Sequence, residues 1–212
     1  MKRFLITGGG IAAAALLGSC STMSKDECLA GAWGEKGYAD GAAGYPMSRL
    51  DDHAKACEKY QVGPNPAAYG SARQDGLRTY CTFQRGWTEG RAGNTYYGVC
   101  RPEEEAEFLP AYNDGRRLHE VEAAVASAES ALSSAEARIE DREDKLDAKQ
   151  RELRSDGLTD DEKQRIRDRI DEVRGEIRSA RRNAREARDA LDRAEWDLRQ
   201  VRGELSGRYP VF

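Results

Sequence analysis

The chain has 212 residues, of which 34% are charged and 39% hydrophobic, and its formal net charge at pH 7 is −4. A mildly acidic chain without a block of Lys and Arg is a poor candidate for nucleic-acid binding, because that affinity depends on clustered basic side chains. The composition changes near Pro102, from a part rich in glycine and cysteine to one dominated by Ala, Glu, Asp, Arg and Leu, so we expect two unlike parts.

Residues 1–19 are typical of a secretory signal peptide. A basic start, Met1-Lys2-Arg3, is followed by a mostly apolar run and by small residues. The sequence Leu17-Gly18-Ser19-Cys20 resembles a bacterial lipobox, which implies cleavage before Cys20 and attachment of lipid, palmitate included, to that cysteine. Two rival interpretations remain. One is an ordinary signal peptide that ends near a cysteine. The other is a spanning anchor, although the apolar run falls short of the roughly 20 residues that such a helix needs.

The lipobox also predicts where the protein resides. Several acyl chains on one residue are enough for stable attachment to a membrane. The residue after the cysteine is Ser21 rather than aspartate, which favours the outer membrane by analogy with enteric bacteria, with the protein facing the periplasm. Cleavage removes Lys2 and Arg3, so the net charge of −4 becomes −6 in the mature chain.

Four cysteines remain after Cys20, and an even number in an oxidising compartment predicts two disulfides. The sequence alone does not choose among the three connectivities. We favour Cys28–Cys57 and Cys81–Cys100 because each pair closes a separate, moderate loop, worth roughly 3 kcal/mol in the chain-entropy description. A metal site is not expected, since there is no Cys-x-x-Cys pair. His53 lies one helical turn before Cys57, and we interpret this spacing as accidental.

A short pattern recurs four times, with a small residue first, then Tyr, Trp or Arg, any residue, an acid and Gly. The copies are Gly37-Tyr38-Ala39-Asp40-Gly41, Ala72-Arg73-Gln74-Asp75-Gly76, Gly86-Trp87-Thr88-Glu89-Gly90 and Ala111-Tyr112-Asn113-Asp114-Gly115. Two copies extend to a third glycine, Gly44 or Gly93, so their glycines share one helical face and allow close backbone approach. We therefore predict a small, Gly-rich, disulfide-stapled domain of short helices over residues 20–116.

Six side chains of these repeats are the candidates for a site. They are Tyr38, Asp40, Asp75, Trp87, Glu89 and Asp114. On one interpretation the acids and aromatics form a shared ligand site. On the other, each acid caps or bridges a neighbouring turn while the aromatic residue packs. We favour the second, because isolated carboxylates without a Lys, His or metal partner make a poor catalytic site. No catalytic residue, metal ligand or cofactor is predicted.

Several motifs of this part occur together in a known family. They are Met23-Ser24-Lys25-Asp26-Glu27-Cys28, Trp33, Gly37-Tyr38-x-Asp40-Gly41, His53-x-x-Ala56-Cys57, Tyr69, Asp75-Gly76-Leu77, Tyr80-Cys81 and Tyr112-x-Asp114-Gly115. With the lipobox, this combination resembles the bacterial lipoproteins of the domain of unknown function 2799 family, the YfiL-like proteins, over about residues 20–125. The resemblance implies an envelope lipoprotein and supplies no catalytic residues.

The second part carries the heptad pattern of a coiled coil. The apolar positions recur every seven residues from Leu118 to Leu153, and again from Ile170 to Leu205. Between the two series, Gly157 suits a helix end, and Thr159 with Glu162 forms a capping box for the next helix. We therefore predict an antiparallel hairpin over residues 117–206, with its turn near 155–159, in which Leu153 lies near Ile166, Leu146 near Val173 and Leu118 near Val201.

A two-helix seam buries little surface, so three further arrangements stay open for this hairpin. Two hairpins can form a four-helix bundle, the helices can pair in trans within a dimer, or the outer face can bind a helix of another envelope protein. The last residues, 207–212, form an apolar tail that can dock on the small domain.

The function predicted from these features is that of a non-enzymatic envelope lipoprotein with a structural or protein-interaction role. The main alternative is an enzyme or ligand-binding protein that uses the acids and aromatics of the N-terminal domain; peptidoglycan binding is another. Against an enzyme, there is no Ser/His/Asp pattern, phosphate-binding Gly-rich loop or zinc signature.

Overall fold

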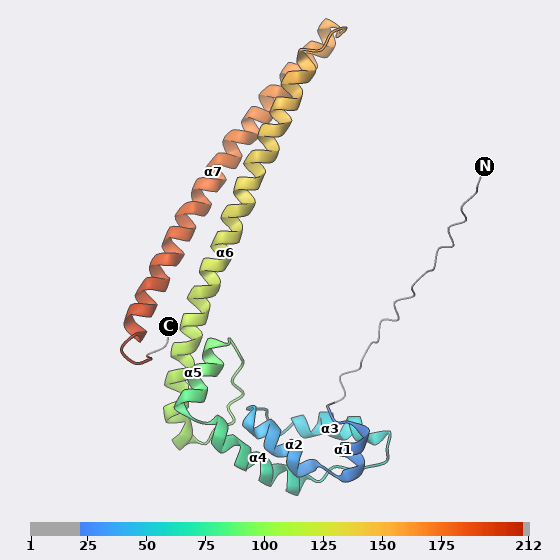
Figure 1. Ribbon diagram of the computed structural model, residues 1–212, viewed down its shortest axis with the longest axis vertical. Helices are drawn as coiled ribbons and strands as arrows, with labels where there is room; N and C mark the ends of the chain where they lie inside the picture. The colour runs from blue at the N-terminus through green and yellow to red at the C-terminus, as the bar shows by residue number, and fades with distance from the viewer. Residues whose placement is uncertain (1–21, 210–212) are drawn as a thin grey trace, which may run out of the picture. The chain divides into compact units, whose positions relative to one another are not determined.

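The computed structural model describes residues 22–209. The predicted signal peptide, Cys20 and residues 210–212 lie outside the described part. All regular structure in the described range is α-helical, in seven helices (Figure 1), so the predicted mainly α class is confirmed. Contacts divide the chain into two compact units, which meet in sequence between Leu77 and Arg78. The boundary predicted at residue 116 falls inside a continuous helix instead.

The first unit contains three short helices and most of a fourth. They are α1 (Lys25–Ala30), α2 (Trp33–Ala42), α3 (Arg49–Glu58) and α4 (Pro66–Tyr80), whose last three residues belong to the second unit. Ser24 and Glu27 form a capping box at the start of α1, and Gly31, with φ of +65°, ends it. These local signals keep α1 short and turn the chain into α2.

The core of the first unit is small and contains a disulfide. Its buried residues are Met23, Cys28, Trp33, Leu50, Cys57 and Tyr69. Cys28 is bonded to Cys57, with their Cα atoms 5.4 Å apart, and the bond joins α1 to α3. This is the pair that the loop lengths favour.

Helices α2 and α4 cross with their backbones in direct contact. A Cβ atom built on Gly37 would lie 2.1 Å from the carbonyl oxygen of Tyr69, and one on Gly41 would lie 2.1 Å from that of Arg73. On the opposing helix, a Cβ on Gly76 would lie 2.2 Å from the carbonyl oxygen of Tyr38. No side chain larger than hydrogen fits at these three positions, which explains why the first two repeats of the sequence pattern end in glycine.

The second unit contains α5 (Phe83–Arg91) and two long helices, α6 (Pro102–Leu153) and α7 (Asp160–Leu205). Cys81, just before α5, is bonded to Cys100, just before α6, with Cα atoms 5.6 Å apart. The hydroxyl of Tyr96 reinforces this loop, since it accepts the backbone N–H of Cys100 at 3.1 Å and donates to Glu105 at 2.6 Å. Burial and the Glu105 carboxylate raise the pKa of Tyr96 to about 12.

Helices α5 and α6 repeat the crossing of α2 and α4. A Cβ atom on Gly86 would lie 2.4 Å from the carbonyl oxygen of Phe108, and one on Gly90 would lie 2.1 Å from that of Tyr112. On α6, a Cβ on Gly115 would lie 2.6 Å from the carbonyl oxygen of Trp87. The four sequence repeats therefore pair two by two, one pair of copies in each unit, and each unit has its own disulfide.

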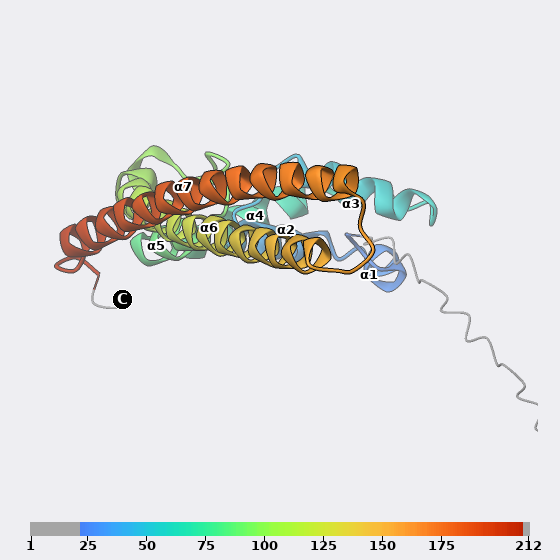
Figure 2. The same ribbon diagram turned by 90° about the horizontal axis from the view of Figure 1, so that it is seen from above.

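Helices α6 and α7 form the predicted antiparallel hairpin and lie side by side in both views (Figures 1 and 2). The part of this hairpin that follows residue 117 is called the arm. Thr159 and Glu162 form the predicted capping box at the start of α7, and Gly157 takes a φ of +84° in the turn. With 46 residues, α7 is roughly 70 Å long.

Ion pairs between the two helices fix the register of the arm. Glu136 pairs with Arg188 at 2.9 Å, Glu143 with Arg181 at 2.7 Å, and Glu122 with Arg202 at 3.0 Å. With Arg142, which pairs with Glu176 at 2.9 Å, these contacts join the two helices over much of the length of the arm, as the predicted antiparallel hairpin requires.

Burial along the seam is uneven. Near the turn, α7 contributes four buried residues, Ile166, Ile170, Val173 and Ile177. In the middle of the arm the seam residues Ala184, Leu191 and Leu198 stay partly exposed. At the base a second core contains Trp87, Ala111, Leu118, Val201, Leu205 and Tyr209. The ring of Tyr209 stacks on Trp87 with 3.8 Å between centroids, so the chain just after α7 packs at the base of the arm.

Candidate functional site

The six candidate side chains are divided between the two units. Tyr38, Asp40 and Asp75 belong to the first, and Trp87, Glu89 and Asp114 to the second. Only two of the acids are buried, Asp40 with 8% of its surface exposed and Glu89 with 7%. Asp75 is exposed, and Tyr38 is 48% exposed, so this tyrosine does not pack as the structural interpretation requires.

Asp40 accepts hydrogen bonds from two buried side chains of other helices. His53 Nε2 lies 2.7 Å from Asp40 Oδ2, and the Tyr69 hydroxyl donates to the same oxygen at 2.5 Å. Because a carboxylate only accepts, this contact favours the imidazole tautomer with its proton on Nε2. Burial, and then the hydrogen bond to Asp40, raise the pKa of Tyr69 above its ordinary value of 10.

This cluster is not among the predicted sites, because the spacing of His53 was considered only relative to Cys57. Leu50, His53 and Cys57 lie three and four residues apart, which places them on one face of α3, and all three are buried. That spacing was the available signal that His53 points into the core. Its Nδ1 atom is buried without a hydrogen-bond partner in the described structure.

The Asp40, His53 and Tyr69 cluster is enclosed in the core of the first unit. An aspartate that orients a histidine is the base-and-orienter pair of many hydrolases. Here the third group is Tyr69, which is fully buried, and His53 is 2% exposed. A general base must come within hydrogen-bond reach of a substrate, and solvent does not reach this one.

Glu89 is the acid of its repeat in the second unit, as Asp40 is in the first, but it has different partners. Glu89 pairs with Arg85 at 2.9 Å and accepts the side-chain amide of Asn94 at 2.7 Å. The two units are more alike in the loop that follows α5 in one and α2 in the other. The carbonyl oxygen of Asn94 accepts the Tyr112 hydroxyl at 2.6 Å, and that of Tyr45, in the first unit, accepts Arg73 Nε at 2.8 Å. Burial lowers the pKa of Arg73.

Asp114 holds the residues that follow α7. It pairs with Arg208 at 2.7 Å and accepts the Tyr209 hydroxyl at 3.0 Å. Burial and this contact raise the pKa of Tyr209 to about 12. Trp87, which lies beneath the same ring, completes the contact. In this unit the acids bridge neighbouring elements and the aromatic residue packs.

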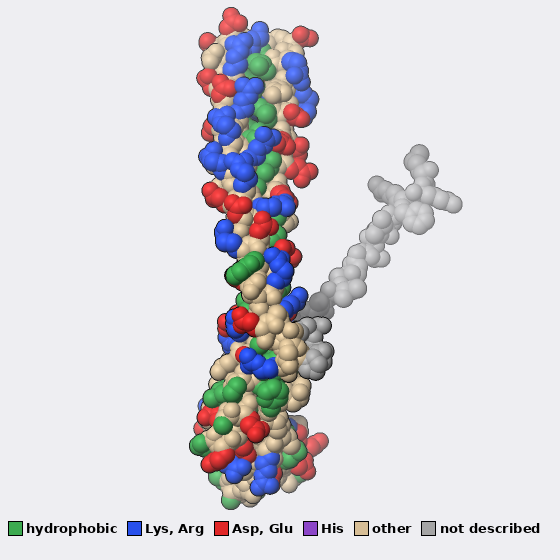
Figure 3. All heavy atoms as spheres, turned by 90° about the vertical axis from the view of Figure 1, so that its left-hand side faces the viewer, with side chains coloured by type: hydrophobic (Ala, Val, Ile, Leu, Met, Phe, Trp, Pro, Cys, Tyr) green, Lys and Arg blue, Asp and Glu red, His purple; other side chains and the backbone are tan. Residues whose placement is uncertain are grey.

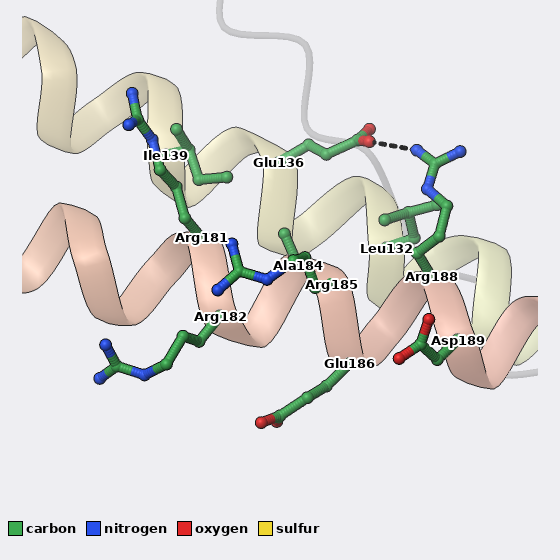
Figure 4. Close-up of a pocket in the computed structure, with 10 residues that line it drawn as sticks. All are labelled: Leu132, Glu136, Ile139, Arg181, Arg182, Ala184, Arg185, Glu186, Arg188 and Asp189. Atoms are coloured by element: carbon green, nitrogen blue, oxygen red, sulfur yellow. Dashed lines mark hydrogen bonds and ion pairs between the residues drawn. The ribbon is translucent and has the colours of Figure 1, made fainter.

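A groove follows the seam in the middle of the arm. Its floor is formed by Leu132 and Ile139 of α6 and by Ala184 of α7, and arginines of α7 line one side. In Figure 4 the Glu136 side chain reaches across the two helices to Arg188, next to these apolar residues. Figure 3 shows hydrophobic side chains in a broken line along the arm, with basic and acidic groups on either side.

No group of three His, Cys, Asp or Glu side chains within residues 22–209 is placed to hold a metal ion. No helix in the same range is long and apolar enough to cross a membrane.

Comparison with known proteins gives one result. Residues 32–117 match the model of a family described as protein of unknown function (DUF2799). This confirms the resemblance drawn from the motifs. No curated protein and no solved structure matches the chain.

The DUF2799 segment contains all four repeats and both glycine crossings, since it runs from the start of α2 to Arg117 in α6. The match stops at the base of the arm. The match therefore covers both glycine crossings and the Cys81–Cys100 disulfide, whereas Cys28 and the arm beyond residue 117 lie outside it.

Proposed function

We propose that this chain is a non-enzymatic envelope lipoprotein that is anchored through Cys20 and uses its arm to contact protein in the periplasm. The observation that carries the proposal is the arm itself. It extends far beyond the family segment, and its seam stays partly exposed in the middle, beside the groove over Leu132 and Ile139. An exposed apolar strip rimmed by charges is typical of an interaction surface.

The acids of the small domain support the same proposal. Asp40, Glu89 and Asp114 each bind one or two neighbouring side chains that hold helices or loops together. Each therefore has a structural task that explains its position without a substrate.

Site-specific photo-crosslinking in intact cells tests the contact role. We would place probes at Asp156 in the turn and at Trp196, which is 56% exposed on α7, with a control probe at the exposed Asp51 of the first unit. We expect discrete protein adducts from the two arm positions and none from Asp51. Absence of any adduct from the arm, with the protein present at normal level, would overturn the proposal.

The anchor is tested separately by labelling cells with an alkyne analogue of palmitate. The wild-type chain should carry the label and sediment with outer membranes, and Cys20→Ser should lose the label and leave the membrane fraction. A labelled Cys20→Ser chain would show that another residue is acylated, and an unlabelled one that stays in the membrane fraction would show that a spanning segment provides the attachment.

A further inference from the structure

Two oppositely charged edges border the groove of the arm. We call Arg178, Arg181, Arg185 and Arg188 of α7 the arginine edge, and Glu136, Glu140, Glu143 and Asp147 of α6 the acidic edge. Their spacings of three and four residues put each set on one side of its helix. All eight side chains are exposed.

Half of these charges are paired within the chain. Glu136 and Glu143 reach across the seam to Arg188 and Arg181, so both edges border the same face of the arm. Their neighbours Glu140, Asp147, Arg178 and Arg185 lie one helical turn or less away, and none of the four has an ion pair in the described structure. Each edge thus presents two unused charges of one sign, with the apolar groove floor between the edges.

The register determines how these unused charges can meet. Since Glu143 reaches Arg181 and Glu136 reaches Arg188 across the seam, the acidic edge and the arginine edge run past one another over the same stretch of the arm. Within one chain they are on opposite margins of the hairpin. They come together only if a second hairpin covers this face so that its arginine edge lies over the acidic edge of the first, and its acidic edge over the arginine edge.

We propose that a second copy of this chain docks on this face, related to the first by a twofold axis parallel to the arm. That operation lays α6 of one copy over α7 of the other. It brings Glu140 alongside the Arg185 of the second copy, and Asp147 alongside its Arg178, with an offset along the arm similar to the one that Glu143 bridges to Arg181 within one chain, four such contacts in each dimer. A twofold axis across the arm would instead place arginine edge on arginine edge, and like charges in contact are strongly unfavourable.

The groove floor supports the same occupant. Leu132, Ile139 and Ala184 lie on the covered face, so the second copy removes from water apolar surface that a two-helix seam leaves exposed. A C2 contact requires a surface complementary to itself, and this face carries both signs of charge along the same stretch of the arm. The parallel arrangement also puts the bases of both arms at the same end. The inference deepens the proposed function, on which it rests for the role of the arm as a contact surface.

Charge exchange tests the pairing on the full chain, purified in a density-matched detergent and followed by sedimentation equilibrium. We expect the wild type to dimerise, with an affinity that falls as salt is added because exposed charges are screened. Arg178→Glu/Arg185→Glu and, separately, Glu140→Arg/Asp147→Arg should each weaken dimerisation at least about tenfold, since every contact becomes repulsive. An equimolar mixture of the two variants should recover the wild-type affinity.

The matched control is Arg138→Glu/Arg193→Glu, which changes the net charge equally at two exposed arginines outside both edges. This variant should dimerise like the wild type. A photo-crosslinker at Asp156 tests the orientation: it should join turn to turn, and a product joining the turn to residues near Arg117 would establish the antiparallel alternative and overturn the inference.

A monomeric wild type, or a mixture of the two charge variants that stays monomeric, would also overturn it. Failure here is distinguishable from failure of the proposed function. A chain that is monomeric in solution and still gives adducts with another protein from the arm in cells would retain the contact role and lose the twofold dimer.

Discussion

Burying a carboxylate costs free energy unless hydrogen bonds replace the water that it loses. Asp40 meets this condition through His53 and Tyr69, which come from two other helices, so one oxygen atom links α2, α3 and α4. The core around this oxygen is small, which makes a buried polar link between three helices a large part of what holds the first unit together.

Replacing Asp40 should therefore destabilise the first unit. In Asp40→Ala the Tyr69 hydroxyl and the His53 Nε2–H lose their acceptor while buried, and each lost partner costs about 1–3 kcal/mol, so the free energy of unfolding should fall by about 2–6 kcal/mol. Native-state hydrogen exchange of amides in α3 and α4 measures this loss. Asp51→Ala, at an exposed position of α3, should change it by less than about 0.5 kcal/mol. Equal effects of the two variants would contradict the role given to Asp40.

Glu27 gives the fold a predictable response to acid. Hydrogen bonds from Lys36, at 2.7 Å, and from the backbone N–H of Ser24 lower the pKa of Glu27 from 4.5 to about 2. Because the pKa is lower in the folded state, the stabilisation is fully present above pH 4.5 and is lost as the pH falls from about 4.5 towards 2. Since the side chain is 38% exposed, solvent screening keeps the effect below about 1 kcal/mol.

The measurement is the free energy of urea unfolding of wild type and Glu27→Gln between pH 2 and 7. The two curves should be separated at neutral pH and converge in the acid range. Glu58→Gln, an exposed acid at the end of α3, serves as the control. A separation that persists unchanged at pH 2 would show that the charge of Glu27 is not its source.

Among the helices, the glycine crossings determine which pairs can form. Where a helix backbone lies against a carbonyl oxygen of its neighbour, even a methyl group has no room, and Gly41 and Gly90 are both in this position. Elsewhere in α2, a Cβ on Gly34 would lie 4.0 Å from its nearest neighbours, which is ordinary contact. The same residue type thus has opposite roles on one helix.

Substitution by alanine should separate these roles. Gly41→Ala forces α2 and α4 apart and should cost about 1–3 kcal/mol or more, as overpacking generally does. Gly34→Ala has room for the methyl group and should stabilise the fold by up to about 1 kcal/mol through helix propensity. Differential scanning calorimetry of both variants measures the contrast. A Gly41→Ala chain as stable as Gly34→Ala would mean that the crossing is wider than described.

The hairpin could be predicted from the sequence, whereas the pairing of helices at the glycine crossings could not. The heptads from Leu118 to Leu205 dictate helix length, turn and register, because a seven-residue period has few other solutions. The repeated glycines indicate close packing, but the pattern does not say which copies pair. Asp40 and His53 are thirteen residues apart in the sequence and lie on different helices, and nothing local encodes their contact. The start of α6 at Pro102 also differs from the predicted boundary at 116, since the sequence around Gly115 resembles a break and is a crossing point.

On the scale of the whole molecule, the same combination of a glycine crossing and a disulfide occurs in each unit. Each unit contains a glycine crossing, with Gly37, Gly41 and Gly76 in the first and Gly86, Gly90 and Gly115 in the second. Each has its own disulfide, and the closed loops span 29 and 19 residues without overlapping in sequence. The arm extends from the second of these two combinations. Each disulfide should therefore stabilise mainly the unit that contains it.

Removing one disulfide at a time tests whether each stabilises only its own unit. In the chain-entropy description, loss of either bridge costs roughly 3–4 kcal/mol. Cys28→Ser/Cys57→Ser should lower hydrogen-exchange protection in α2 and α3 and leave α5 unchanged, and Cys81→Ser/Cys100→Ser should do the reverse. The distal arm, around Val173, lies outside both loops and should keep its protection in both variants, which makes it the internal control. Loss of protection throughout the chain on removing Cys28–Cys57 alone would mean that the two units unfold as one, because the end of α4 then transmits the loss beyond Leu77.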